Sequence, residues 1–185
     1  MNTSTAEASS KTISSLDIAY DNHRLFDALV AGMADLLEKT AGLDDASIFI
    51  GSIATELGAE IEKQYRTTLG RHRLSPEQLP LVLVDLANRA GGAFFIIEEN
   101  EDRIVLGNGA CPLGDAVRNH PSLCMLTSNI FGRMAANTVG SAAVDLEQTI
   151  ATGAAGCRVV IHLNRKGLRL DTTEYLRDDA TADAD

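Results

Sequence analysis

A glycine pair, Gly91-Gly92, separates two kinds of sequence pattern in this chain. Before the pair, apolar residues recur at the 3.6-residue spacing of amphipathic helices. After it come short runs rich in β-branched and aromatic residues, bounded by glycines and charged turns. Helices and strands therefore follow each other in blocks, which argues against a doubly wound parallel sheet. The sequence predicts an α+β fold, with N-terminal helices followed by an antiparallel sheet that is crossed by a helix.

Three helices are expected before the glycine pair, over residues 16–41, 44–69 and 75–89. Pro76 is expected at the first helical position of the third, because proline suits the start of a helix. Gly51 and Gly58 interrupt the second helix and indicate close packing against another element. The apolar stripe of 16–41 fits packing on its own domain and pairing with a second copy equally well. This helix is therefore a candidate dimerisation element.

The part after the glycine pair is expected to hold the sheet. The predicted elements are a β-hairpin over 93–97 and 103–106, a helix over 122–138, and two further strands over 142–150 and 157–163. The small, polar residues 1–15 are expected to be a disordered tail, and residues 177–185 an acidic, solvated one. Residues 42–176 then form one sensor or output domain.

Charge and composition exclude several classes of partner. The formal net charge is −10 and aromatic residues make up 4 % of the chain. Such a chain repels nucleic acid and anionic lipid, and it offers few aromatic platforms for base stacking. No signal peptide or membrane span is recognisable, so we expect a soluble, cytoplasmic protein without direct nucleic-acid or membrane contact. Thiols are kept reduced there, so the three cysteines are not expected to form structural disulfides.

Cys111, Cys124 and Cys157 each lie at the edge of a predicted element, where one fold can bring them together. The N-terminus of a helix is expected to lower the pKa of Cys124. Three thiolates suit an iron–sulfur cluster, or alternatively zinc, but leave one ligand position open. His120 is the first candidate for it, with His162 and Asp115 as others. Thr127, Ser128 and Asn129 are candidate hydrogen-bond donors to a sulfur or ligand. The competing interpretation is that all three cysteines are small buried side chains.

Three blocks, GNGACPLGDAV, HPSLCMLTSNIFG and GAAGCRVVIHL, resemble the methanogen output domain 1 family, in a likeness that spans about residues 48–163. More distantly, the chain is similar to the effector domain of the SUF-operon repressor, whose cysteines hold an iron–sulfur cluster, and to 4-vinyl reductase-like domains. The resemblance implies that Cys111, Cys124 and Cys157 match the cysteines of that pattern. It also implies a 4-vinyl reductase-like fold. The chain has no winged-helix segment, so any output must pass through a partner.

These features together predict a sensory module without enzymatic activity. It would bind an iron–sulfur cluster, or less favourably zinc, and relay redox, oxygen or nitric oxide state to a signalling protein or transcription regulator, acting as a homodimer. The alternative is a metal-free regulatory domain that binds a small molecule. No catalytic residues are expected, because the chain has no Walker A, GxSxG or HExxH sequence and no recognisable nucleophile–histidine pair.

Overall fold

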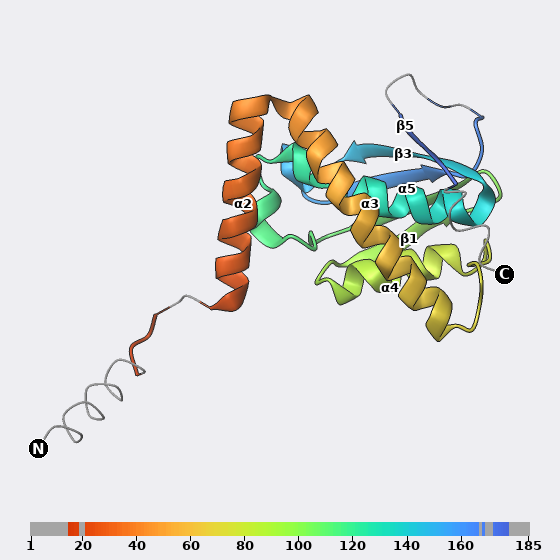
Figure 1. Cartoon of the computed structure of the whole chain (residues 1–185), viewed down its shortest axis with the longest axis horizontal. Coiled ribbons are helices and arrows are strands. Elements are labelled where there is room, and N and C mark those ends of the chain that lie inside the picture. The colour runs from red at the N-terminus through yellow and green to blue at the C-terminus, as the bar shows by residue number, and fades with distance from the viewer. Residues whose placement is uncertain (1–14, 19–20, 167, 169–171, 178–185) are drawn as a thin grey trace, which may run out of the picture.

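The computed structural model describes residues 15–18, 21–166, 168 and 172–177 (Figure 1). The helices α2 (Asn22–Ala41), α3 (Leu43–Thr68) and α4 (Leu79–Arg89) come first. They are followed by β1 (Phe94–Glu99), β2 (Arg103–Asn108), the short 3₁₀ helices η1 (Gly114–Val117) and η2 (Pro121–Leu123), α5 (Cys124–Val139), β3 (Ser141–Gln148), η3 (Ile150–Thr152), β4 (Cys157–His162) and β5 (Thr173–Leu176). The predicted α+β class, with helices first and an antiparallel sheet after them, is confirmed.

The sheet has five strands in the order β1-β2-β4-β3-β5, and every neighbouring pair is antiparallel. Ile104, Leu106, Val159 and Ile161 share one face of it and enter a core with Met134 of α5. Because side chains alternate along a strand, Asn108 and Cys157 point to this same face. These two residues are register partners at one end of the sheet. One end of the core face therefore carries a cysteine.

Helix α5 packs on the sheet, and α3 crosses α5 on the side away from it (Figure 1). The α3–α5 contact is close because two glycines face α5. A Cβ at Gly51 would lie 2.8 Å from Nδ2 of Asn129, and one at Gly58 would lie 3.3 Å from Ile130. The predicted role of these glycines in close helix packing is confirmed. None of the described helices is long and apolar enough to cross a membrane.

Helix α2 begins later than the sequence pattern indicates. It was expected from residue 16, but its first residue is Asn22 and the described residues 15–18 are not helical. Asp21 adopts an extended conformation and its side chain accepts a hydrogen bond from the backbone N–H of Arg24, which caps the helix at this point. The expected disordered and acidic tails fall almost wholly in 1–14 and 178–185, outside the described residues.

Other element boundaries also differ from those expected. Helix α4 begins at Leu79 and not at Pro76. The Ser75 carbonyl accepts from the N–H groups of Gln78 and Leu79, but Pro80 has no N–H with which to continue this series of hydrogen bonds. Strand β3 ends at Gln148, and Ile150 belongs to η3. Strand β5, which pairs with β3 at the edge of the sheet, was not expected at all.

Candidate functional site

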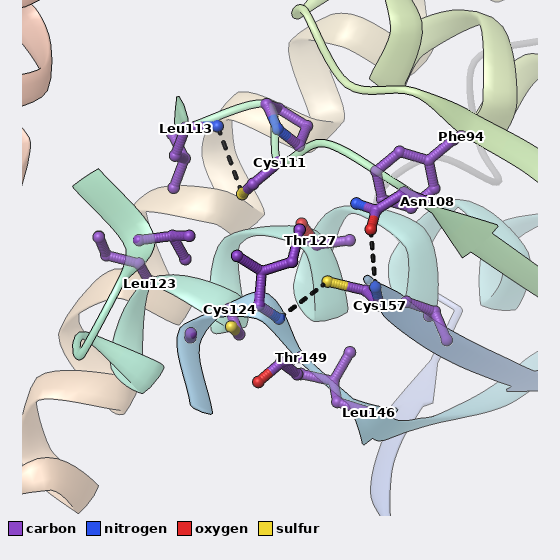
Figure 2. A pocket seen from close by; sticks show the side chains of 15 residues that line it. Phe94, Asn108, Cys111, Leu113, Leu123, Cys124, Thr127, Leu146, Thr149 and Cys157 are labelled. Atoms are coloured by element: carbon purple, nitrogen blue, oxygen red, sulfur yellow. Dashed lines mark hydrogen bonds between the residues drawn. The ribbon is translucent and has the colours of Figure 1, made fainter. Parts of the chain in front are cut away.

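Three separate segments bring Cys111, Cys124 and Cys157 to one small cavity (Figure 2). Cys111 follows the end of β2, Cys124 is the first residue of α5, and Cys157 is the first residue of β4. All three are free thiols of intermediate exposure. The three element edges that the sequence places around the cysteines thus meet at the cavity.

Asn108 and Gly156 fix the position of Cys157. The side-chain oxygen of Asn108, which is almost fully buried, accepts a hydrogen bond of 2.8 Å from the backbone N–H of Cys157 (Figure 2). A Cβ at Gly156 would overlap the carbonyl oxygen of Asn108, so only glycine permits this approach of the two chain segments. The Gly-Cys pair at the start of β4 therefore positions the thiol.

Two of the three thiols accept a hydrogen bond from a backbone N–H group. The backbone N–H of Leu113 donates to Sγ of Cys111 at 3.4 Å, and that of Ile150 donates to Sγ of Cys157 at 3.4 Å. The hydroxyl group of Thr149 acts to lower the pKa of the Cys124 thiol, and Thr149 also lines the cavity. Donors aimed at sulfur stabilise thiolates and tune cysteine-bound metal centres.

Burial, with repulsion from Cys157 and Cys111, raises the pKa of Cys124 to about 12. Burial also raises the pKa of Cys111, to which proximity to Cys157 contributes. The expected lowering at the N-terminus of the helix is therefore wrong for Cys124, because desolvation outweighs the helix dipole. Both groups are neutral thiols at neutral pH, so a metal that binds them must displace their protons.

The cavity is small and mostly apolar. Its volume is about 20 Å³, which is about the room of one water molecule and far below the roughly 300 Å³ at which pockets for drug-sized ligands begin. The other residues that line it are Phe94, Asn108, Pro112, Leu113, Val117, Leu123, Thr127, Leu146, Thr149, Ile150, Ala151 and Val159. An organic ligand does not fit this space without rearrangement of the core.

The donor set suits a thiophilic metal, although the side chains as placed do not form a finished ligand sphere. Within the described part of the chain, no three His, Cys, Asp or Glu side chains are arranged to hold one ion. Three soft sulfur donors that share a cavity are the ligand type found in zinc and iron–sulfur sites. Binding there requires the thiols to turn toward a common centre and to lose their protons.

The expected fourth ligands have other partners in the structure. Nδ1 of His120 lies 3.0 Å from Oε2 of Glu38, and Nε2 of His162 lies 2.9 Å from Oδ2 of Asp145 at the far end of β4. Asp115 is exposed and pairs with Arg118. Among the described residues that line the cavity there is no His, Asp or Glu. Ligation by His120 stays a prediction that needs its side chain to move.

Of the three hydroxyl and amide residues expected near the site, only Thr127 lines the cavity. The hydroxyl of Ser128 is bonded to that of Tyr175, and the amide of Asn129 donates to the carbonyl of Met125. Asn108 and Thr149 were not expected at the site. The turn-forming sequence around Asn108 is a signal for a special backbone position, whereas Thr149 is distinguished only once η3 is known, because it caps that helix.

A carboxylate from α2 anchors the segment that leads into Cys124. Oε1 of Glu38 accepts hydrogen bonds from the backbone N–H (3.1 Å) and the hydroxyl (2.6 Å) of Ser122, while Oε2 pairs with His120. Burial acts to raise the pKa of Glu38, but the Ser122 and His120 hydrogen bonds outweigh it, so its pKa lies below the usual value. The cysteine segment is thus tied to the N-terminal helix by an ionised side chain.

Comparison with known proteins gives a family. No curated protein matches the chain. The family model for methanogen output domain 1 matches residues 29–162, from the middle of α2 to the end of β4, and this range includes all three cysteines. The chain therefore belongs to the methanogen output domain 1 family.

Proposed function

We propose that this protein is a sensory module that holds an iron–sulfur cluster, or alternatively zinc, through Cys111, Cys124 and Cys157. In this proposal the module is cytoplasmic and not an enzyme, and the redox, oxygen or nitric oxide state of its site is relayed to a signalling partner. The observation that carries the proposal is that three thiols from three distant segments line one cavity, where two of them accept a backbone hydrogen bond. If the cysteines served only as packing side chains, nothing would require all three to line the same cavity.

The residues around the thiols have definite tasks under this proposal. The N–H groups of Leu113 and Ile150 stabilise sulfur as a thiolate, and the mostly apolar lining shields the ligands from bulk water. When bound, a cluster supplies a centre that gains and loses an electron and reacts with oxygen or nitric oxide. With three protein ligands the fourth position is open to solvent species or an effector, which favours sensing over permanent structural binding.

The test is an absorption spectrum of protein purified without oxygen, together with iron, sulfide and zinc analysis. Broad absorption at about 400 nm, together with iron and sulfide in similar amounts, supports the cluster. Zinc without iron supports the alternative metal. A colourless protein that takes up neither metal after anaerobic reconstitution contradicts the proposal. That outcome favours the interpretation that the three cysteines are small buried side chains, or that a metal-free domain binds a small molecule after the cavity rearranges.

Single variants identify the ligands. Cys111→Ser, Cys124→Ser and Cys157→Ser are each expected to lose most of the metal, because removal of one of three protein ligands leaves too few. His120→Gln and His162→Gln form a matched pair, since both histidines are partly buried and paired with a carboxylate. Metal loss in His120→Gln alone identifies His120 as a ligand, and retention in both variants leaves the fourth position to an exogenous group.

A further inference from the structure

Helix α2 presents a wide apolar stripe to solvent. Its members are exposed by 53 to 63 %, and they are Leu25, Phe26, Leu29, Met33 and Leu36. The inner face of the same helix carries Val30, Ala34 and Glu38, which contact the cysteine-containing region. Figure 1 shows α2 at the edge of the molecule, with its outward side facing away from the sheet and the other helices. We call the five exposed residues the α2 stripe.

The spacing of the α2 stripe is that of a helix–helix seam. Phe26, Leu29, Met33 and Leu36 follow one another at intervals of three, four and three residues. This is the spacing that keeps side chains on one line of contact between two helices packed side by side. An apolar seam on a solvated helix surface lowers stability and solubility unless another surface covers it.

Gly32 of α2 is a second indication of a helix contact, independent of the exposed apolar side chains. A glycine inside a helix destabilises it by about 1 kcal/mol relative to alanine, so its presence needs a reason. Gly51 and Gly58 of α3 have one, because α5 packs against them. A Cβ at Gly32 would meet no atom within 4 Å among the described residues, and Gly32 is exposed. Gly32 lies three residues after Leu29 and four residues before Leu36, so it borders the stripe on the helix surface. A glycine at this position permits close approach of a helix from outside the chain.

The exposed apolar area is on the scale of a protein interface. Helix α3, which follows α2 directly, exposes four more large side chains, namely Ile48, Phe49, Ile53 and Leu57. Nine half-exposed apolar side chains amount to several hundred Å², whereas a standard interface takes about 800 Å² from each partner. Soluble monomers seldom expose so many large apolar side chains on two consecutive helices.

The composition of the chain restricts what covers the stripe. Residues 1–14 are mostly small and polar, and residues 178–185 contain only aspartate, alanine and threonine, so neither segment offers a matching face of large apolar side chains. A net charge of −10 opposes docking on anionic lipid. A second copy brings an identical uncharged stripe, and the nearby Asp35 is already paired with Lys39 of the same helix. Two copies can therefore meet at this face without unpaired like charges in the seam.

We propose that a second copy of this chain packs on the α2 stripe, so that α2 of one copy lies against α2 of the other around a two-fold axis. The opposite face of α2 holds the segment before Cys124 through Glu38. A change at the thiols that moves this segment therefore moves one half of the dimer contact. This coupling between the thiols and the dimer contact rests on the proposed function, whereas the proposed dimer itself does not.

Sedimentation velocity of the full-length chain over a range of concentrations tests the dimer. Leu29→Glu and Met33→Glu are expected to weaken dimerisation by more than about tenfold, because each places a charge in an apolar seam. Leu81→Glu is the matched control, since Leu81 is equally exposed but lies on α4, and it is expected to leave dimerisation unchanged. Unchanged far-UV circular dichroism verifies that the variants are folded.

Gly32→Ala separates close helix contact from a general apolar effect. Alanine favours the isolated helix, so the monomer is expected to be at least as stable, while the dimer weakens because a methyl group enters the contact. A wild-type chain that stays monomeric at tens of micromolar overturns the proposal. So does a dimer that survives both glutamate substitutions. Metal analysis of the same samples is independent of this result, so failure of the dimer and failure of the metal site are distinguishable.

Discussion

Under the proposed function, the raised pKa values of two thiols are expected to make metal uptake depend on pH. Cys124, with a pKa raised to about 12, and Cys111, with a raised pKa, are protonated at neutral pH and must release protons to bind metal. The apparent affinity for zinc is therefore expected to rise between about pH 6 and 8, by up to tenfold per pH unit for each proton displaced. Competition with a chromophoric chelator measures this slope. An affinity independent of pH would show that these thiols are not ligands.

Glu62 is a buried carboxyl group whose charge is expected to lower stability at neutral pH. Burial raises its pKa, which the hydrogen bond from Asn137 only partly offsets, and Nε of Arg66 lies 3.9 Å away. Because the folded state binds the proton more tightly than the unfolded state, the stability from Glu62 is complete below its unfolded pKa and is lost as pH rises through the folded pKa.

Glu62→Gln is therefore expected to gain stability relative to wild type as pH rises from about 4 to 7, by about 1.4 kcal/mol for each unit of pKa elevation. Glutamine keeps an oxygen that accepts from Asn137. Urea denaturation at both pH values measures the difference in free energy of unfolding. The exposed Glu56→Gln on the same helix is the control, and it should show no such trend. Equal behaviour of the two variants would contradict the assignment.

For individual residues, the sequence predicts that the three thiols lie near one another, but it does not predict which residues hold them in place. Cysteines at the ends of recognisable elements can be placed near one another from pattern alone. Glu38 and Ser122 are 84 positions apart, and no local pattern connects a helix carboxylate to a distant hydroxyl. The raised pKa of Cys124 could not be predicted from the sequence either, because its cause is burial by residues from several segments.

Among the elements, β5 depends on one glycine of α5. A Cβ at Gly132 would overlap the ring of Tyr175, the buried residue of β5 whose hydroxyl bonds to Ser128. Gly132→Ala is expected to destabilise the fold by about 1–3 kcal/mol through overpacking. Thermal or urea denaturation measures this loss. Gly109→Ala, at a site where a Cβ meets no described atom within 4 Å, should have little effect.

A double-mutant cycle identifies the cause of that loss. If the Tyr175 ring is the obstacle, Gly132→Ala should cost much less in a Tyr175→Ala background, because the methyl group then has space. Additive losses in the double variant would instead indicate that Gly132 matters for the backbone of α5 itself.

Element prediction succeeded where a pattern repeats and failed where it does not. Helix α3 and the β1–β2 hairpin have long or paired patterns, and both were predicted closely. Strand β5 has only four residues with one buried side chain, which is too short for an alternation to be recognised. The start of α2 was misplaced because Leu16 and Ile18 extend an apolar pattern, although both are exposed and the Asp21 cap begins the helix beyond them.

For the whole molecule, α2 is the element that links the thiol site to the surface. One face of α2 contacts the cysteine-containing core and another carries the α2 stripe. If both proposals hold, metal binding and dimerisation are coupled, and linkage requires each to change the affinity of the other by the same factor. The wild-type dimer dissociation constant is thus expected to differ between metal-loaded and metal-free protein.

Glu38→Ala tests whether this coupling runs through the carboxylate. The substitution leaves the α2 stripe intact but removes the acceptor for Ser122. The buried N–H and hydroxyl groups of Ser122 then lose their partner, which costs about 1–3 kcal/mol of stability.

Sedimentation should show that metal-loaded and metal-free samples differ in their dimer dissociation constant, both in wild type and in Asp35→Ala. Asp35 is the control because it is an acid on the same helix that pairs with Lys39. In Glu38→Ala the dimer should persist while the difference disappears. A metal-dependent difference that survives in Glu38→Ala would mean that the signal reaches the surface by another route, such as the packing of Val30 and Ala34 on the cysteine core.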